Sequence, residues 1–126
     1  MGRTEKELDL IDEIIKYQIF LKERYGFDWN DVSGVLEKLK EEIKELEDAL
    51  KQNENKKIEE EFGDILITIV NLSRFLNLDL IDTLNKSYMK FKKRVDKMKK
   101  EAKKENIDLE KLNIYELDKL WEKSKK

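Results

Sequence analysis

Two pairs of acidic residues are the part of this sequence best suited to chemistry. Glu42 and Glu45 are spaced i,i+3, and Glu61 and Asp64 repeat that spacing. Residues at this spacing share one face of a helix, so two antiparallel helices would bring four carboxylates to one edge. Like charges held this close repel one another unless a cation lies between them. Because the chain has no histidine and no cysteine, its oxygen ligands favour Mg²⁺ or Mn²⁺ over zinc.

The same spacing also fits a plain solvated helix face, because Glu-x-x-Glu is a common pattern and the chain has 29 acids. Gly63 favours a site, since it directly precedes Asp64 within a helical pattern. Glycine there costs about 0.5–1 kcal/mol relative to alanine, which suggests that a neighbouring backbone or a ligand comes close. The spacing alone leaves both interpretations open.

A second region with possible chemistry is basic. Ten of residues 86–104 are Lys or Arg and two are acidic. Lys90 and Arg94 share one helical stripe that would hold phosphates, although most of the ten cations fit a solvated helix. A nucleic-acid surface is disfavoured, because the stripe lacks interleaved exposed aromatics. Trp121 and Lys125, one turn apart, fit either a packing anchor or a base stack beside a phosphate contact.

Helices must position these residues, because the composition leaves little else. The 126 residues include 44% charged and 39% hydrophobic residues, no proline and only four glycines. This composition excludes a sandwich, a barrel and a βαβ fold, and the length fits one domain over residues 1–126. We therefore expect an all-α bundle of four main helices and a short C-terminal helix. The spacing of apolar residues predicts where the five helices lie. They run from about residue 5 to 24, from the connector at 27–30 to about 52, from about 56 to 76, from about 80 to 104, and from about 113 onward.

The third of these helices also predicts an oligomer. From Ile65 to Leu76 its apolar residues cover nearly the whole circumference. Such a helix needs cover on all sides, and a bundle of this size has too few other helices to supply it. We therefore expect a homodimer or a higher homo-oligomer.

Charge and hydropathy exclude other classes of protein. The formal net charge is −2, so the molecule is not a polycation built for nucleic acid. No apolar stretch approaches the roughly 18–20 residues that span a bilayer, and the first residues lack the apolar region of a signal peptide. We expect a cytoplasmic protein with neither a nucleic-acid nor a membrane partner.

The acidic segments also resemble a known family. Glu41-Glu42-Ile43-Lys44-Glu45 and, after fifteen residues, Glu61-Phe62-Gly63-Asp64 are similar to the EExxE and ExxD signature of MazG-type nucleoside triphosphate pyrophosphohydrolases. The resemblance extends over about residues 25–126 and is strongest to the C-terminal of the two repeats in longer MazG proteins. It departs at Tyr88, where that repeat often has asparagine. Four further segments match in order and spacing: Phe27–Trp29, Val70–Arg74, Lys90–Arg94 and Leu120–Lys125.

The resemblance implies roles for individual residues. The magnesium ligands would be Glu42, Glu45, Glu61 and Asp64, with Glu41 and Glu60 in supporting positions. Lys38 would lie beside the site. The substrate would be held by Lys90 and Arg94 at its phosphates, and Trp121 with Lys125 would close over the nucleotide. Relatives assemble as dimers or larger oligomers of helical bundles.

The implied reaction is magnesium-dependent hydrolysis of a nucleoside triphosphate to the monophosphate and pyrophosphate, for the house-cleaning of nucleotide pools. A metal-activated water would attack the α-phosphorus, with Glu41 or Glu45 as the general base. The alternatives are a narrower dUTP, dCTP or phosphoribosyl-ATP pyrophosphohydrolase, or a non-catalytic helical scaffold.

Overall fold

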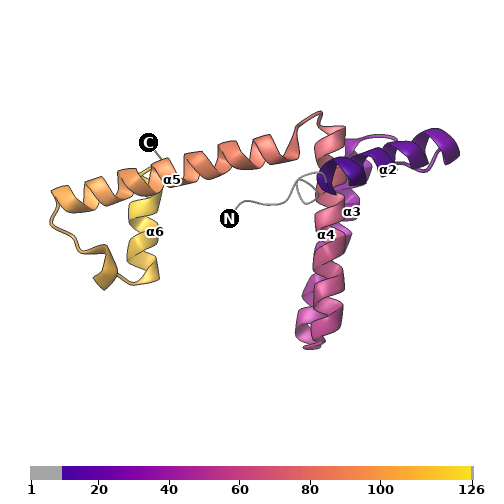
Figure 1. The fold of residues 1–126 in the computed structure, drawn as a ribbon. Coiled ribbons are helices and arrows are strands. Elements are labelled where there is room, and N and C mark those ends of the chain that lie inside the picture. The colour runs from indigo at the N-terminus through magenta and orange to yellow at the C-terminus, as the bar shows by residue number, and fades with distance from the viewer. Residues whose placement is uncertain (1–9, 126) are drawn as a thin grey trace. The chain divides into compact units, whose positions relative to one another are not determined.

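The computed structural model describes residues 10–125, and these residues are all-α (Figure 1). The predicted class is confirmed, with four long helices and a short C-terminal one close to their predicted positions. The start of the first helix near residue 5 lies outside the described residues. A short 3₁₀ helix, η1, was not predicted. The elements are α2 (Leu10–Tyr25), α3 (Val32–Lys51), α4 (Asn55–Phe75), α5 (Leu80–Lys104), η1 (Leu109–Lys111) and α6 (Ile114–Lys123).

The chain divides into two compact units, one up to Leu80 and the other from Ile81 onward. The first contains α2, α3 and α4, and the second contains nearly all of α5 together with η1 and α6. The prediction of one domain over residues 1–126 stays a prediction. No helix among residues 10–125 combines the length and the apolar character that crossing a membrane requires.

In the first unit, α3 and α4 form an antiparallel hairpin (Figure 1). The side chain of Asp31 caps the start of α3 by accepting a hydrogen bond from the Gly34 N–H. The turn into α4 includes Asn53, whose positive φ of 55° suits asparagine better than most residues. The hairpin core is small and contains Val35, Ala49, Ile65 and Val70. This core holds the two acidic segments in a fixed register.

Several large apolar side chains of α4 and its C-cap residue remain about half-exposed in the single chain: Phe62, Leu66, Ile67 and, at the cap, Leu76. The sequence predicted an oligomer because this helix carries apolar residues on nearly all sides. Their exposure agrees with that reasoning. The oligomer itself stays a prediction.

In the second unit, side chains of α5 hold the C-terminal helix α6. The Arg94 guanidinium donates from Nε to Ser124 Oγ at 3.0 Å and from an NH2 nitrogen to the Trp121 carbonyl oxygen at 2.7 Å. It also lies 3.7 Å from the centroid of the Trp121 ring. The centroids of the Trp121 and Phe91 rings are 5.2 Å apart. A capping box between Asn113 and Glu116 closes the start of α6.

Candidate functional site

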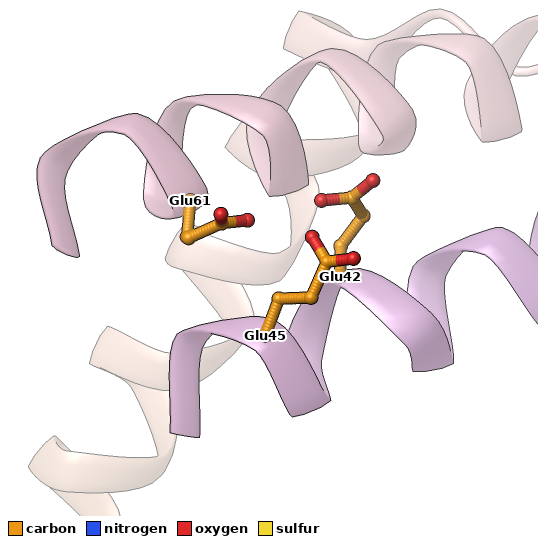
Figure 2. Close-up of side chains that lie close together, drawn as sticks. All are labelled: Glu42, Glu45 and Glu61. Carbon is orange, nitrogen blue, oxygen red and sulfur yellow. The ribbon is translucent and has the colours of Figure 1, made fainter. Parts of the chain in front are cut away.

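The α3–α4 hairpin brings three carboxylates together. Glu42 and Glu45 lie one turn apart on α3, and Glu61 faces them from α4 (Figure 2). One oxygen from each of the three side chains lies within 4.8 Å of the others. We call these three residues the acidic triad. Their convergence follows from the i,i+3 spacing on α3 and from the antiparallel packing of α4 against it.

Two oxygens of the acidic triad lack a partner for their negative charge. Glu42 is only 4% exposed, although it carries a charge. Oε2 of Glu42 and Oε2 of Glu61 are buried and have no hydrogen-bond partner among residues 10–125. A buried carboxylate oxygen without a donor is costly, and a bound cation removes that cost. The donor set is oxygen only, so the triad fits a hard divalent ion.

Lys38 neutralises part of this charge. Its Nζ lies 2.9 Å from Glu42 Oε1 and 3.8 Å from Glu41 Oε1. The hydrogen bond to Glu42 raises the pKa of the Lys38 ammonium, and nearby negative charges raise it further against the opposing effect of burial. Lys38 therefore stays charged and holds Oε1 of Glu42, while the other oxygen of that carboxylate remains unpaired.

Burial and the neighbouring acidic residues raise the pKa of the Glu61 carboxyl. Burial is the largest effect that raises the pKa of the Glu61 carboxyl, followed by a hydrogen bond from its protonated form to Glu45. The negative charges of the triad and of Asp64 raise this pKa further. In the metal-free site, Glu61 therefore holds its proton more tightly than an ordinary glutamate does. A divalent cation would take the place of that proton.

Other predicted residues of the acidic site lie at its edge. Asp64 is exposed and does not belong to the acidic triad, although its charge acts on Glu61. Glu41 and Glu60 are also exposed. The expectation that a neighbouring backbone approaches Gly63 is wrong for the described residues. A Cβ at this position would meet nothing within 4 Å. Within the described residues, therefore, no neighbouring backbone explains this glycine.

The residues predicted to hold the substrate lie in the second unit. Lys90, Arg94 and Lys125 line a basic pocket of about 780 Å³, together with further lysines of α5. Lys90 and Lys125 are exposed, and Lys125 pairs with Glu122 at 3.1 Å. Arg94 instead uses its guanidinium to hold α6. Trp121 is partly buried against it, as a packing anchor would be.

One ion pair in the first unit was not predicted from the sequence. Asp28, in the connector before α3, accepts a hydrogen bond at 2.8 Å from Arg74 near the end of α4. Arg74 also donates to Asn71 Oδ1 at 2.7 Å. Asn71 and Arg74 therefore have a structural role, in holding the connector against α4. The one sign in the sequence that Asp28 has a role is its position directly before Trp29, in a segment that resembles the family.

The comparisons with known proteins agree with the geometry. Residues 30–99 match the MazG nucleotide pyrophosphohydrolase domain. The Thermotoga maritima protein named "Nucleoside triphosphate pyrophosphohydrolase/pyrophosphatase MazG" is 50% identical over 100 residues, which are 79% of this chain. The Escherichia coli K12 protein named "Nucleoside triphosphate pyrophosphohydrolase" is 29% identical over 103 residues, which are 80% of this chain. The uncharacterised YabN of Bacillus subtilis is 35% identical over 65 residues, covering 52% of this chain and 13% of YabN.

This chain spans only 38% of the length of the Thermotoga protein and 39% of that of the Escherichia protein. The stronger resemblance to the C-terminal repeat stays a prediction. The family resemblance seen in the acidic segments is confirmed over more than half of the sequence. This chain belongs to the MazG nucleotide pyrophosphohydrolase family.

Proposed function

We propose that this chain hydrolyses nucleoside triphosphates to nucleoside monophosphates and pyrophosphate, with magnesium as its cofactor. The convergence of Glu42, Glu45 and Glu61, with two buried oxygens that have no partner among the described residues, supports this most directly. The names of the Thermotoga and Escherichia relatives support the same reaction. House-cleaning of nucleotide pools is the biological role we propose.

The acidic triad would hold the magnesium ion, with Asp64 completing the ligand set and Glu60 supporting it from the same helix. Manganese is the expected substitute, because it shares the preference for oxygen ligands. When bound, the ion would supply Lewis-acid activation of water and neutralise negative charge on the phosphates. Lys38 would keep one oxygen of Glu42 occupied and so orient that carboxylate.

In the proposed reaction, the oxygen of a water molecule bonds to the α-phosphorus. The bond from this phosphorus to the oxygen bridging the α and β phosphates breaks, and pyrophosphate leaves. The water's proton passes to a carboxylate, for which Glu41 and Glu45 are the candidates. Glu41 suits this role because it lies outside the acidic triad, one turn before Glu45 on the same stripe of α3.

A triphosphate carries about four negative charges and needs cations beyond a single magnesium ion. We propose that Lys90 and Lys125, which are both exposed, contact the phosphates. Arg94 and Trp121 are proposed at the same substrate site. The interactions of Arg94 with α6 suggest that it also positions Lys125, which directly follows Ser124.

We also propose that the chain acts as a homodimer or a higher homo-oligomer in the cytoplasm, without a nucleic-acid or membrane partner. The half-exposed apolar side chains of α4 support the oligomer. A second copy is the simplest cover for them, because identical chains present the same surface to one another.

The test is analysis of the phosphate products after incubation with a panel of nucleoside and deoxynucleoside triphosphates, with Mg²⁺ or with EDTA. The expected result is monophosphate plus pyrophosphate that appears only with the metal. Glu61→Gln should abolish turnover, whereas Glu59→Gln, an exposed residue of the same helix, should preserve it. Diphosphate plus orthophosphate would contradict attack at the α-phosphorus. No turnover at all would favour the scaffold, and turnover of one substrate alone would favour a narrower enzyme.

A further inference from the structure

Lys38 supplies the acidic triad with a positive charge from the chain itself. Its Nζ lies 2.9 Å from Glu42 Oε1 and 3.8 Å from Glu41 Oε1. Among residues 10–125, Lys38 is the only residue that forms an ion pair with a member of the triad. The Glu42 side chain is 6% exposed, and that of Lys38 is 37% exposed. Because little water surrounds Glu42, this ion pair is screened less than a pair on the surface.

This ion pair competes with a metal ion for the same carboxylate. A divalent ion held by the acidic triad would share Glu42 with the Lys38 ammonium, and the two positive charges would repel each other. The ammonium also offsets part of the negative charge that attracts the ion. Both effects weaken metal binding. Each is larger at a buried carboxylate than in open solvent, because the effective dielectric constant is lower there.

Lys38 also favours metal binding in one way, because it orients the Glu42 carboxylate. This contribution is small, since burial already confines the Glu42 side chain, which faces Glu61 of α4 (Figure 2). The benefit of an ordered carboxylate is similar for every metal ion. The repulsion instead grows with the charge of the ion and is twice as large for a divalent ion as for a monovalent one. The repulsion therefore outweighs the benefit of orientation.

We infer that Lys38 sets the metal affinity of the acidic triad and holds it below the affinity that the three carboxylates alone would reach. This inference rests on the proposed magnesium site and gives Lys38 a role beyond the orientation of Glu42. The same ion pair stabilises the metal-free protein, because without Lys38 the charge of Glu42 would be buried and unpaired. The occupancy of the triad then responds to Mg²⁺ over a higher range of concentration.

The test is isothermal titration calorimetry of the full chain with Mg²⁺ alone, in the absence of nucleotide. Lys38→Gln removes the charge but keeps an N–H donor, and it should lower the dissociation constant for Mg²⁺ about 10-fold. Lys40→Gln is the matched control. Lys40 is on the same helix and loses the same charge, but its partner is the exposed Glu37, so the dissociation constant should not change. An unchanged or higher dissociation constant in Lys38→Gln would overturn the inference.

A second measurement separates an effect of charge from an effect of geometry. La³⁺ is close to Ca²⁺ in size but carries one more charge. If Lys38→Gln raises the affinity for Ca²⁺ about 10-fold, the same repulsion predicts a rise of about 30-fold for La³⁺. Only binding that Glu61→Gln abolishes is counted, because the chain has many other carboxylates. Equal gains for Ca²⁺ and La³⁺ would contradict an origin in charge.

Lys38→Gln weakens the hold on the buried charge of Glu42, so circular dichroism must first show that the variant is folded without metal. If it is not, Lys38→Arg decides. This variant keeps the charge and should keep the affinity for Mg²⁺, and a gain in affinity would overturn the inference.

The inference and the proposed reaction can fail separately. If no triphosphate is hydrolysed, the proposed function fails, but tighter binding of Mg²⁺ by Lys38→Gln that requires Glu61 would still support the inference. If triphosphates are hydrolysed and the dissociation constant of Lys38→Gln is unchanged, the function stands and the inference is wrong.

Discussion

Arg74→Met should destabilise this protein far more than the loss of a typical surface ion pair. Arg74 and Asp28 are 2.8 Å apart, and their side chains are only 13% and 8% exposed. Removing the guanidinium leaves the Asp28 carboxylate buried without its charged partner and frees Asn71 Oδ1, which accepts from Arg74 at 2.7 Å. Breaking a buried pair in this way costs about 3–5 kcal/mol. That is a large share of the 5–15 kcal/mol by which a typical domain is stable.

The matched control is Lys40→Met. Lys40 pairs with Glu37 at 3.2 Å, but both side chains are more than 70% exposed, so its loss should cost between about 0 and 1 kcal/mol. Urea unfolding followed by circular dichroism measures both variants. Adding Asp28→Asn to Arg74→Met should restore part of the lost stability, because it removes the stranded charge. Equal destabilisation by Arg74→Met and Lys40→Met would refute the reasoning from burial.

Three further predictions concern the acidic triad and the second unit. Mg²⁺ at about 100 times its dissociation constant should stabilise the protein by roughly 2.7 kcal/mol in thermal unfolding, and Glu61→Gln but not Glu59→Gln should lose this effect. The raised pKa of Glu61 means that the folded state binds its proton more tightly than the unfolded state does, so stability in EDTA should fall as pH rises above the usual glutamate range. Accordingly, in EDTA the Glu61→Gln variant should be as stable as the unaltered protein near pH 4 and more stable than it near pH 7. If the two proteins are equally stable at both pH values, this reasoning is contradicted. Arg94→Leu should detach α6, seen as faster hydrogen exchange of the α6 amides, whereas Lys99→Leu on the same helix should not change that exchange.

The sequence predicted the features that depend on local periodicity. Helix positions followed from apolar spacing. Gly26, whose φ of +65° favours glycine, directly follows the end of the first helix. The convergence of Glu42, Glu45 and Glu61 was also predictable, since it needs only i,i+3 spacing and a helical hairpin.

The features that the sequence did not reveal are contacts between distant segments. Asp28 and Arg74 are 46 residues apart, and neither lies in a pattern that indicates the other. The interactions of Arg94 with Trp121 and Ser124 have the same origin, since residue type alone allows either a phosphate contact or a packing contact.

The short helix η1 was missed for a different reason. It depends on a local cap, in which Asp108 accepts a hydrogen bond from the Glu110 N–H, and it has no periodic signal in the sequence.

Charge balance connects the acidic triad with the basic second unit. The three ionised carboxylates of the triad carry three negative charges, and Lys38, held at 2.9 Å from Glu42, offsets one of them. The remaining two charges equal those of one divalent cation, and Asp64, the proposed fourth ligand, adds one further negative charge. A triphosphate must therefore find its remaining positive charge elsewhere, either in a second ion near Asp64 or in the lysines of α5 and Lys125. Replacing Lys90 should consequently raise KM for the triphosphate without changing the stabilisation of the protein by Mg²⁺ alone. A loss of that stabilisation would show that Lys90 acts on the acidic triad and not on the substrate.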